Sequence, residues 1–137
     1  MPTYSKLLSA VSTVLFLSLP SAASAENQGL TRTIVTRSDV SVPDREAIIT
    51  RVEFTPGGLA DWHTHPGDEM SYVAEGEVTV MIAGQPPRTY AAGAAFVIPA
   101  GVVHSARNET SATNRLVGVY LLEKGKPLAS PAPAPAP

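Results

Sequence analysis

The stretch GGLADWHTHPGDEMSYVAEG, residues 57–76, decides the fold, because it places two histidines and Glu69 at short, fixed intervals. A single residue separates His63 from His65, and Glu69 follows four positions after His65. A β-strand turns alternate side chains to the same face and rises about 3.3 Å per residue, so the two imidazoles would project together, about 7 Å apart. Two imidazoles at that spacing can chelate one metal ion.

The remaining donors come from a turn and from a second stretch. Pro66 and Gly67 break the strand and let the next strand bring the Glu69 carboxylate back toward the histidine pair. The third histidine of the protein, His104, lies in GAAFVIPAGVVHSARN, residues 93–108. Three imidazole nitrogens and one carboxylate oxygen suit a divalent first-row ion, and an octahedral ion so bound would keep two positions open for water or substrate.

An isolated pair of histidines would more simply be interpreted as two solvent-facing strand residues, with His104 as a core residue. The spacing of the surrounding residues argues against that interpretation. In the first stretch the fixed positions are Gly57, His63, His65, Glu69 and Gly76. In the second they are Gly93, Pro99, Gly101, His104 and Asn108. Each residue type makes up only a few per cent of an average protein, so ten matches by accident are not plausible.

At these ten positions the chain resembles the cupin superfamily, and in size it is similar to the small single-domain cupins of the cupin type-2 or quercetin dioxygenase-like group. The resemblance implies an all-β fold, a small double-stranded β-helix or jelly-roll barrel. It also implies a homodimer and one divalent transition metal per chain, which could be Fe, Mn, Ni, Co, Cu or Zn. The implied metal ligands are His63, His65, Glu69 and His104.

Composition agrees with one small β domain. The chain has 137 residues, of which 44% are hydrophobic and 16% charged, with 13 prolines and 10 glycines. That length allows a single domain. A formal net charge of −2 provides no electrostatic reason to expect nucleic acid or an anionic membrane as a partner. The expected partner, a small-molecule substrate or ligand, follows instead from the metal site. The absence of cysteine excludes disulfides.

Residues 1–25 have the pattern of a secretory signal peptide. Lys6 precedes an apolar run over residues 7–19, and an AxA-type cleavage site ends at Ala25. The apolar run is short for a membrane span, so we expect cleavage after Ala25 and no membrane attachment afterwards. The predicted location is therefore periplasmic or secreted.

The cupin domain is predicted over residues 30–125. Short β-branched and aromatic segments bounded by Gly and Pro predict strands at residues 30–37, 47–54, 70–74, 78–82, 88–90, 95–98, 102–107 and 115–123. The first of these is interpreted as an edge strand. Glu75 and Gly76 predict a tight hairpin. The tail, residues 126–137, alternates Pro and Ala and is expected to be extended and disordered.

Strand parity suggests which residues accompany the ligands. Asp61 would lie on the His63 face at the mouth of the site, where it could accept or deliver a proton; its simpler interpretation is a turn carboxylate. Glu69 and Asp61 are thus the candidate catalytic residues. Ser71 and Ala106 would lie beside the ion and leave space there.

Other side chains are expected to have structural roles. Asn108 is interpreted as a hydrogen-bonding residue of the scaffold. Trp62, Met70 and Tyr72 fall on the face opposite the ligands by strand parity, which predicts packing in the core or in a dimer contact.

The predicted site favours a metal-dependent oxidoreductase, dioxygenase-like, acting on a small organic substrate. Two alternatives stay open. One is a metal-dependent isomerase, lyase or decarboxylase acting on a sugar or a small carboxylate, which needs only a Lewis acid. The other is a non-catalytic protein that binds a small ligand or a metal. A redox-active ion would favour the oxidoreductase, whereas zinc would favour Lewis-acid chemistry or a structural role.

Overall fold

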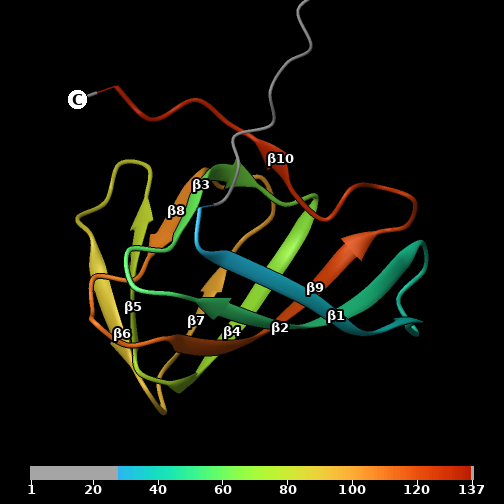
Figure 1. Ribbon diagram of the computed structural model, residues 1–137. Coiled ribbons are helices and arrows are strands. Elements are labelled where there is room, and N and C mark those ends of the chain that lie inside the picture. The colour runs from blue at the N-terminus through green and yellow to red at the C-terminus, as the bar shows by residue number, and fades with distance from the viewer. Residues whose placement is uncertain (1–27, 137) are drawn as a thin grey trace, which may run out of the picture.

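The computed structural model describes residues 28–136, so the predicted signal peptide lies outside the described residues. Ten strands and no helix occur in the described part of the chain (Figure 1). Accordingly, no helix there could cross a membrane. The strands are β1 (Leu30–Asp39), β2 (Arg45–Phe54), β3 (Leu59–Thr64), β4 (Gly67–Glu75), β5 (Glu77–Ile82), β6 (Arg88–Ala91), β7 (Ala95–Ile98), β8 (His104–Arg107), β9 (Asn114–Glu123) and β10 (Ser130–Pro131).

The strands form two five-stranded antiparallel sheets, which together confirm the predicted all-β jelly-roll barrel. The first sheet has the order β1-β2-β9-β4-β7, and the second has the order β10-β3-β8-β5-β6. β1 is at the edge of the first sheet, which confirms the edge strand predicted at residues 30–37. Because neighbours in each sheet come from distant parts of the chain, residues far apart in sequence meet inside the barrel.

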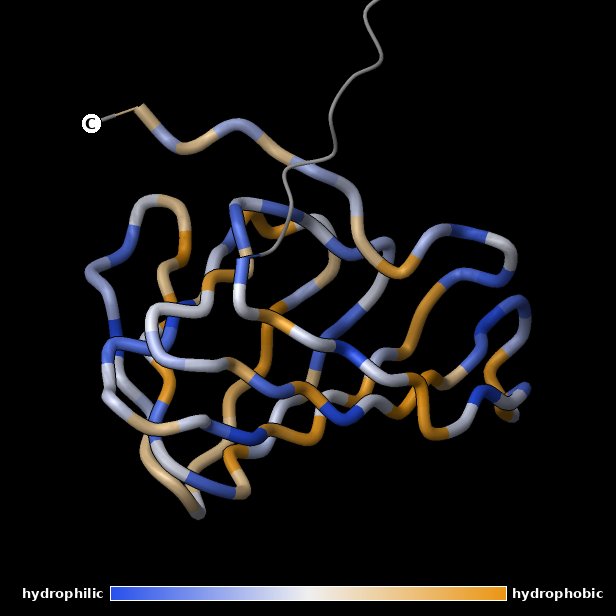
Figure 2. Tube along the Cα trace, viewed as in Figure 1, coloured by the Kyte–Doolittle hydropathy of each residue, from blue (hydrophilic) through white to orange (hydrophobic). Residues whose placement is uncertain are grey.

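Alternation along the strands determines what faces the interior. In β2, REAIITRVEF, every second residue is buried, and Figure 2 shows the matching alternation of hydrophilic and hydrophobic colour along the strands. Most of the buried apolar side chains form one continuous cluster, which we call the apolar half of the barrel. Its members are Val52, Phe54, Ala60, Val73, Val78, Val80, Phe96, Ile98 and Leu116. Burying each large one stabilises the fold by about 1.5–3 kcal/mol.

The turn after β4 differs from the predicted hairpin. β4 and β5 are joined by Gly76 alone, yet β4 pairs with β7 and β9 whereas β5 pairs with β6 and β8. The turn therefore carries the chain from one sheet to the other. Gly76 has a φ of +74°, and a Cβ there would lie 2.1 Å from Oδ1 of Asn114. Glycine is required at this crossing for both reasons.

The tail also differs from its prediction. Residues 126–137 were expected to be disordered, but β10 pairs with β3 and the Ala132 amide donates to the Trp62 carbonyl at 2.9 Å (Figure 1). Leu128 packs against a second buried cluster of Ile48, Tyr120 and Leu122. An extended Pro/Ala chain suits the exposed edge of β3, because proline is tolerated at an edge strand.

The outward side of the first sheet carries exposed apolar side chains. Met70 pairs with Val97 and Tyr72 with Val117, and the four side chains are 37–61% exposed. The prediction that Met70 and Tyr72 pack in the core is therefore wrong. The dimer contact, and with it the homodimer, stays a prediction.

Asn108 has the structural role that the sequence predicted. Its buried Nδ2 donates to the carbonyls of Phe54 and Ala112, at 3.0 and 2.7 Å. Its Oδ1 accepts from the Thr110 amide at 2.8 Å. The side chain thus joins the end of β2 to the loop before β9.

Candidate metal centre

The fold brings the four predicted ligands together. His63 lies on β3, His65 in the turn after it, Glu69 on β4 and His104 at the start of β8. One donor atom from each residue lies within 4.8 Å of all the others. His63 is the register partner of His104, so strand pairing alone places two of the imidazoles side by side.

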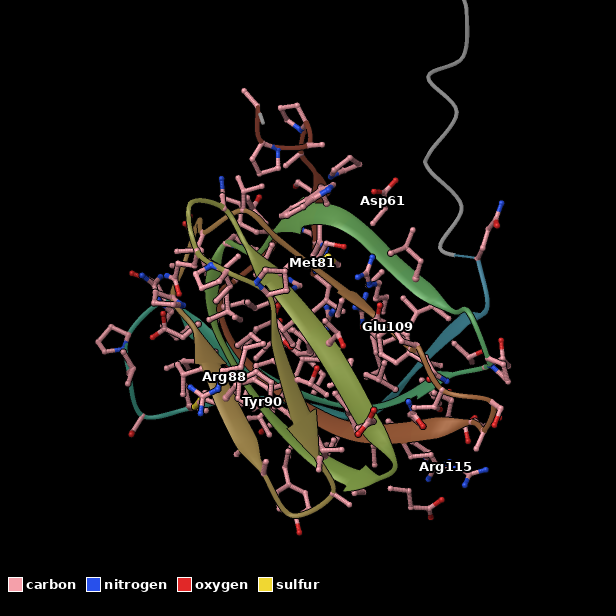
Figure 3. All side chains as sticks on the ribbon, turned by 90° about the vertical axis from the view of Figure 1, so that its left-hand side faces the viewer. Asp61, Met81, Arg88, Tyr90, Glu109 and Arg115 are labelled. Carbon is pink, nitrogen blue, oxygen red and sulfur yellow. The ribbon has the colours of Figure 1, made fainter. Side chains whose placement is uncertain are left out.

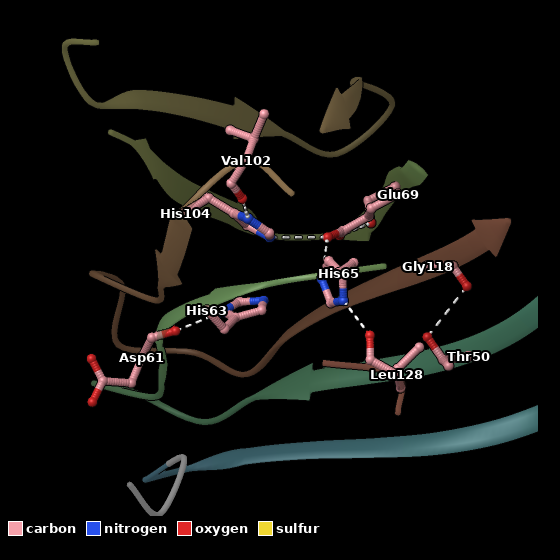
Figure 4. Close-up of polar contacts among 10 residues, drawn as sticks. Thr50, Asp61, His63, His65, Glu69, Val102, His104, Gly118 and Leu128 are labelled. Atoms are coloured by element: carbon pink, nitrogen blue, oxygen red, sulfur yellow. Dashed lines mark hydrogen bonds and ion pairs between the residues drawn. The ribbon is translucent and has the colours of Figure 1, made fainter. Parts of the chain in front are cut away.

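Each histidine is oriented by a backbone carbonyl on its outer nitrogen (Figure 4). Nδ1 of His63 lies 2.6 Å from the Asp61 carbonyl, Nδ1 of His65 lies 2.6 Å from the Leu128 carbonyl, and Nδ1 of His104 lies 2.8 Å from the Val102 carbonyl. A carbonyl oxygen only accepts, so Nδ1 carries the proton in all three rings. The three Nε2 atoms then face the interior, where each would offer a lone pair to a bound metal, the arrangement typical of metal-binding histidines.

The inner nitrogens face the carboxylate. Oε2 of Glu69 lies 3.0 Å from Nε2 of His65 and 3.2 Å from Nε2 of His104. Nε2 of His65 is buried and has no hydrogen-bond partner, which is unfavourable unless a cation occupies the space between the lone pairs. The cluster fits one divalent ion held by three imidazole nitrogens and one carboxylate oxygen.

The electrostatics keep these groups in their metal-binding forms. Burial, together with the neighbouring His104 and His65 rings, lowers the pKa of His63 to about 4, although the Asp61 carbonyl opposes this. Burial alone would raise the pKa of Glu69, but the imidazoles of His104 and His65 hold it well below its usual range. At neutral pH His63 is therefore neutral and Glu69 is ionised, as metal binding requires.

Two of the three predicted neighbours reach the site. The Ser71 hydroxyl donates to Oε1 of Glu69 at 2.6 Å and so holds the carboxylate oxygen that faces away from the histidines. Ala106 lines the cavity beside His104.

Asp61 does not bring its carboxylate into the cluster. The pairing of β3 with β8 shifts register between Ala60 and His63, which interrupts the alternation on which the prediction relied. Its Oδ1 accepts from the Trp62 amide at 2.8 Å. Figure 4 shows the carboxylate pointing away from the His63 ring, and Figure 3 shows the Asp61 side chain projecting away from the barrel. The contribution of Asp61 to the site is its carbonyl oxygen.

Sequence reasoning missed three residues that complete the site. Tyr120, on β9, is the register partner of Glu69, and its ring centroid lies 4.8 Å from that of His65. Arg32, on β1, lines the same cavity. Leu128 supplies the carbonyl that orients His65. The alternation of β9 could have placed Tyr120 inside, but no local signal indicates that residues so distant in sequence meet at the metal centre.

Residues 50–120, slightly more than half of the chain, match the family described as the cupin domain. The chain therefore belongs to the cupin family, as the ten-position pattern predicted. In sequence it is 39% identical over 69 residues to the rhicadhesin receptor of Pisum sativum, and 38% identical over 65 residues to germin-like protein subfamily 2 member 2 of Arabidopsis thaliana. Each alignment covers 44% of this chain but only 30% of the relative.

Solved structures agree on the fold. A cupin-like protein from Thermotoga maritima superposes with a TM-score of 0.62 over 75% of each chain, at 22% identity, which shows likeness of fold alone. A recombinant oxalate oxidase in complex with glycolate has a TM-score of 0.60 and 28% identity, over 79% of this chain and 57% of that chain.

Proposed function

We propose that this protein is an exported, metal-dependent oxidoreductase, dioxygenase-like, that acts on a small organic substrate. The observation that carries the proposal is the convergence of three imidazole nitrogens and the Glu69 carboxylate on one point of a cavity inside the barrel. Four protein ligands leave an octahedral ion with open positions for a substrate. The likeness to an oxalate oxidase that binds glycolate supports redox chemistry on a small oxygen-rich molecule.

The bound ion would supply Lewis acidity and, if redox-active, an electron. The protein's own residues do the rest. The backbone carbonyls behind His63, His65 and His104 fix ring orientation, so each Nε2 faces the ion. Ser71 holds Oε1 of Glu69, which leaves Oε2 toward the ion. The low pKa of Glu69 favours metal binding over proton transfer as the role of this carboxylate.

The cavity can exclude most water from a bound substrate. Its enclosed volume is only about 20 Å³, enough for about one water molecule, and most of its wall is apolar. A small organic substrate would therefore displace that water and also occupy the open mouth of the site, where the apolar wall strengthens electrostatic interactions.

The test begins with protein recovered from the export compartment without added metal. N-terminal sequencing should return Glu26, and elemental analysis should find close to one redox-active ion per chain. Oxygen-uptake screening with enolic, phenolic and carboxylate substrates then follows. Zinc, or no metal, would contradict the oxidoreductase and would favour the Lewis-acid or non-catalytic alternatives.

Variants test the ligand assignment directly. His104→Ala and Glu69→Gln should each lower metal affinity at least about 100-fold while the circular dichroism of the barrel is retained, because both side chains serve the ion rather than the packing. The matched control is Glu75→Gln, which changes an exposed carboxylate on the same strand as Glu69 and should leave metal content unchanged. A full complement of metal in His104→Ala would refute the assignment.

A further inference from the structure

Arg32 places a positive charge inside the barrel. It lies on β1 opposite Val52, and because paired residues of antiparallel strands point to the same face, it shares the inward direction of the buried Val52 side chain. The residue is half-buried and lines the same cavity as Glu69 and His104.

The guanidinium lacks an anionic partner among residues 28–136. Its Nε is buried and makes no hydrogen bond, and no carboxylate in that range forms an ion pair with it. Arg37, on the same strand, has a half-exposed side chain and does form an ion pair, with Glu46 at 3.5 Å. Leaving a buried charged donor unsatisfied costs more than about 1–3 kcal/mol, so this position requires an explanation.

The surroundings of Arg32 favour an anion as its partner. Its guanidinium carbon lies 6.0 Å from the centroid of the Tyr120 ring, which in turn contacts the His65 ring. Burial raises the pKa of Tyr120 to about 12, and the nearby Glu69 charge adds to this, so the hydroxyl stays protonated. With a divalent ion at the cluster, the cavity would hold an excess of positive charge, because Glu69 is the only carboxylate among residues 28–136 that lines it.

We propose that Arg32 binds the carboxylate of the substrate, which makes a small carboxylic acid the substrate class of this protein. The planar guanidinium matches a carboxylate through two parallel hydrogen bonds, and one of these would satisfy the orphaned Nε. Phe54, Phe96 and Leu116 line the cavity with apolar surface, so the acid is a small one with little further polarity. The inference rests on the proposed function, because the metal centre must hold the other end of the acid.

The experiment compares an acid with its neutral analogue. Calorimetry of the metal-loaded protein measures binding of glycolate and of glycolamide, which lacks the negative charge, and elemental analysis of each variant runs in parallel. Arg32→Gln should weaken glycolate binding about 10- to 100-fold, because a hydrogen bond to a charged group contributes about 1.5–3 kcal/mol. Arg32→Lys keeps the positive charge but loses the planar guanidinium. Its glycolate affinity should lie between those of the native protein and of Arg32→Gln. Glycolamide binding should not change.

Arg51→Gln is the matched control, because Arg51 is an exposed arginine on the neighbouring strand β2 and should leave glycolate binding unchanged. Three outcomes would overturn the inference. The native protein could bind glycolate and glycolamide equally well, or bind neither, or it could bind inorganic phosphate through Arg32 in preference to glycolate. Alternatively, Arg32→Gln could keep its metal and bind glycolate with the affinity of the native protein. Failure of the native protein to take up any metal would instead refute the proposed function.

Discussion

The same long strands build two opposite halves of the barrel interior. On β4, Val73 belongs to the apolar half whereas Glu69 belongs to the metal centre. On β9, Leu116 packs in the apolar half whereas Tyr120 contacts His65. Each strand therefore passes from a region where apolar side chains cluster to a region where buried polar atoms converge.

The difference separates stability from function. The apolar half stabilises the fold through burial, whereas the metal centre concentrates buried polar groups, one of them without a hydrogen-bond partner, that cost free energy until an ion binds. Substitutions in the apolar half should destabilise the fold. Substitutions in the metal centre should alter metal and ligand binding and leave the barrel folded.

The largest effect is expected for Ile98→Ala, in the apolar half. Ile98 is 1% exposed, and its truncation should lower the free energy of unfolding by about 3 kcal/mol, because a cavity would remain. Its neighbour on β7, Val97, is 61% exposed, and Val97→Ala should change stability by less than about 0.5 kcal/mol. Denaturant unfolding measures both. Similar losses in the two variants would contradict the division into halves.

The sequence alone predicted the metal centre. The spacing of His63, His65 and Glu69 placed three ligands because strand pitch and turn chemistry are local properties, whereas His104 was assigned through the resemblance to cupins. Strand alternation likewise predicted that Ser71 lies beside Glu69. Local rules of this kind identify which side chains share a face, and the structure agrees wherever the strands are regular.

Local rules failed where pairing between distant segments decides the outcome. Asp61 was misplaced because a register shift in β3 breaks the alternation. The turn at Gly76 was taken as a hairpin because its local chemistry does not reveal that β4 and β5 pair with other strands. Composition indicated an extended tail but not the open edge of β3 that receives it. Arg32 was overlooked for the same reason, since its role depends on a cavity built by other strands.

The second-largest effect is expected from acid, which should lower the stability of the metal-free protein through the groups of the metal centre. The folded-state pKa of His63, about 4, is below its ordinary value of 6.5, so the unfolded chain takes up the proton first as the pH falls. Stability of the metal-free protein should therefore be level above about pH 7 and fall by about 2 kcal/mol between pH 7 and 5. Glu69 acts in the same direction but only at lower pH, because its pKa is also lowered.

Guanidinium unfolding of the metal-free protein at pH 7, 6 and 5 measures this slope. His63→Gln cannot take up a proton at this position and should show a flatter profile over the same range. Val78→Ala, a truncation at a fully buried position of the apolar half, should keep the native slope at a lower stability, since no titrating group changes. A native slope in His63→Gln would mean that another group is responsible.

The smallest effect is expected from truncation of the tail. This change tests whether the metal centre includes the C-terminal segment. Ending the chain after Lys126 removes the Leu128 carbonyl that holds Nδ1 of His65, so the ring can rotate and take up the other tautomer. Metal affinity should fall about 10- to 100-fold, the usual cost of removing a group that orients a metal-binding histidine. Competition with a chelator of known affinity measures the change.

Two matched variants separate the carbonyl from the rest of the tail. Ending the chain after Ala132 keeps Leu128 and β10, and metal affinity should match that of the full chain. Leu128→Ala keeps the backbone carbonyl but loses apolar contact with the cluster of Ile48, Tyr120 and Leu122, so it should lower stability more than metal affinity. If both truncated chains bound metal equally well, His65 would be oriented without the tail, and the tail would not belong to the metal centre. If only the shorter chain lost affinity, the C-terminal segment would be part of the metal centre.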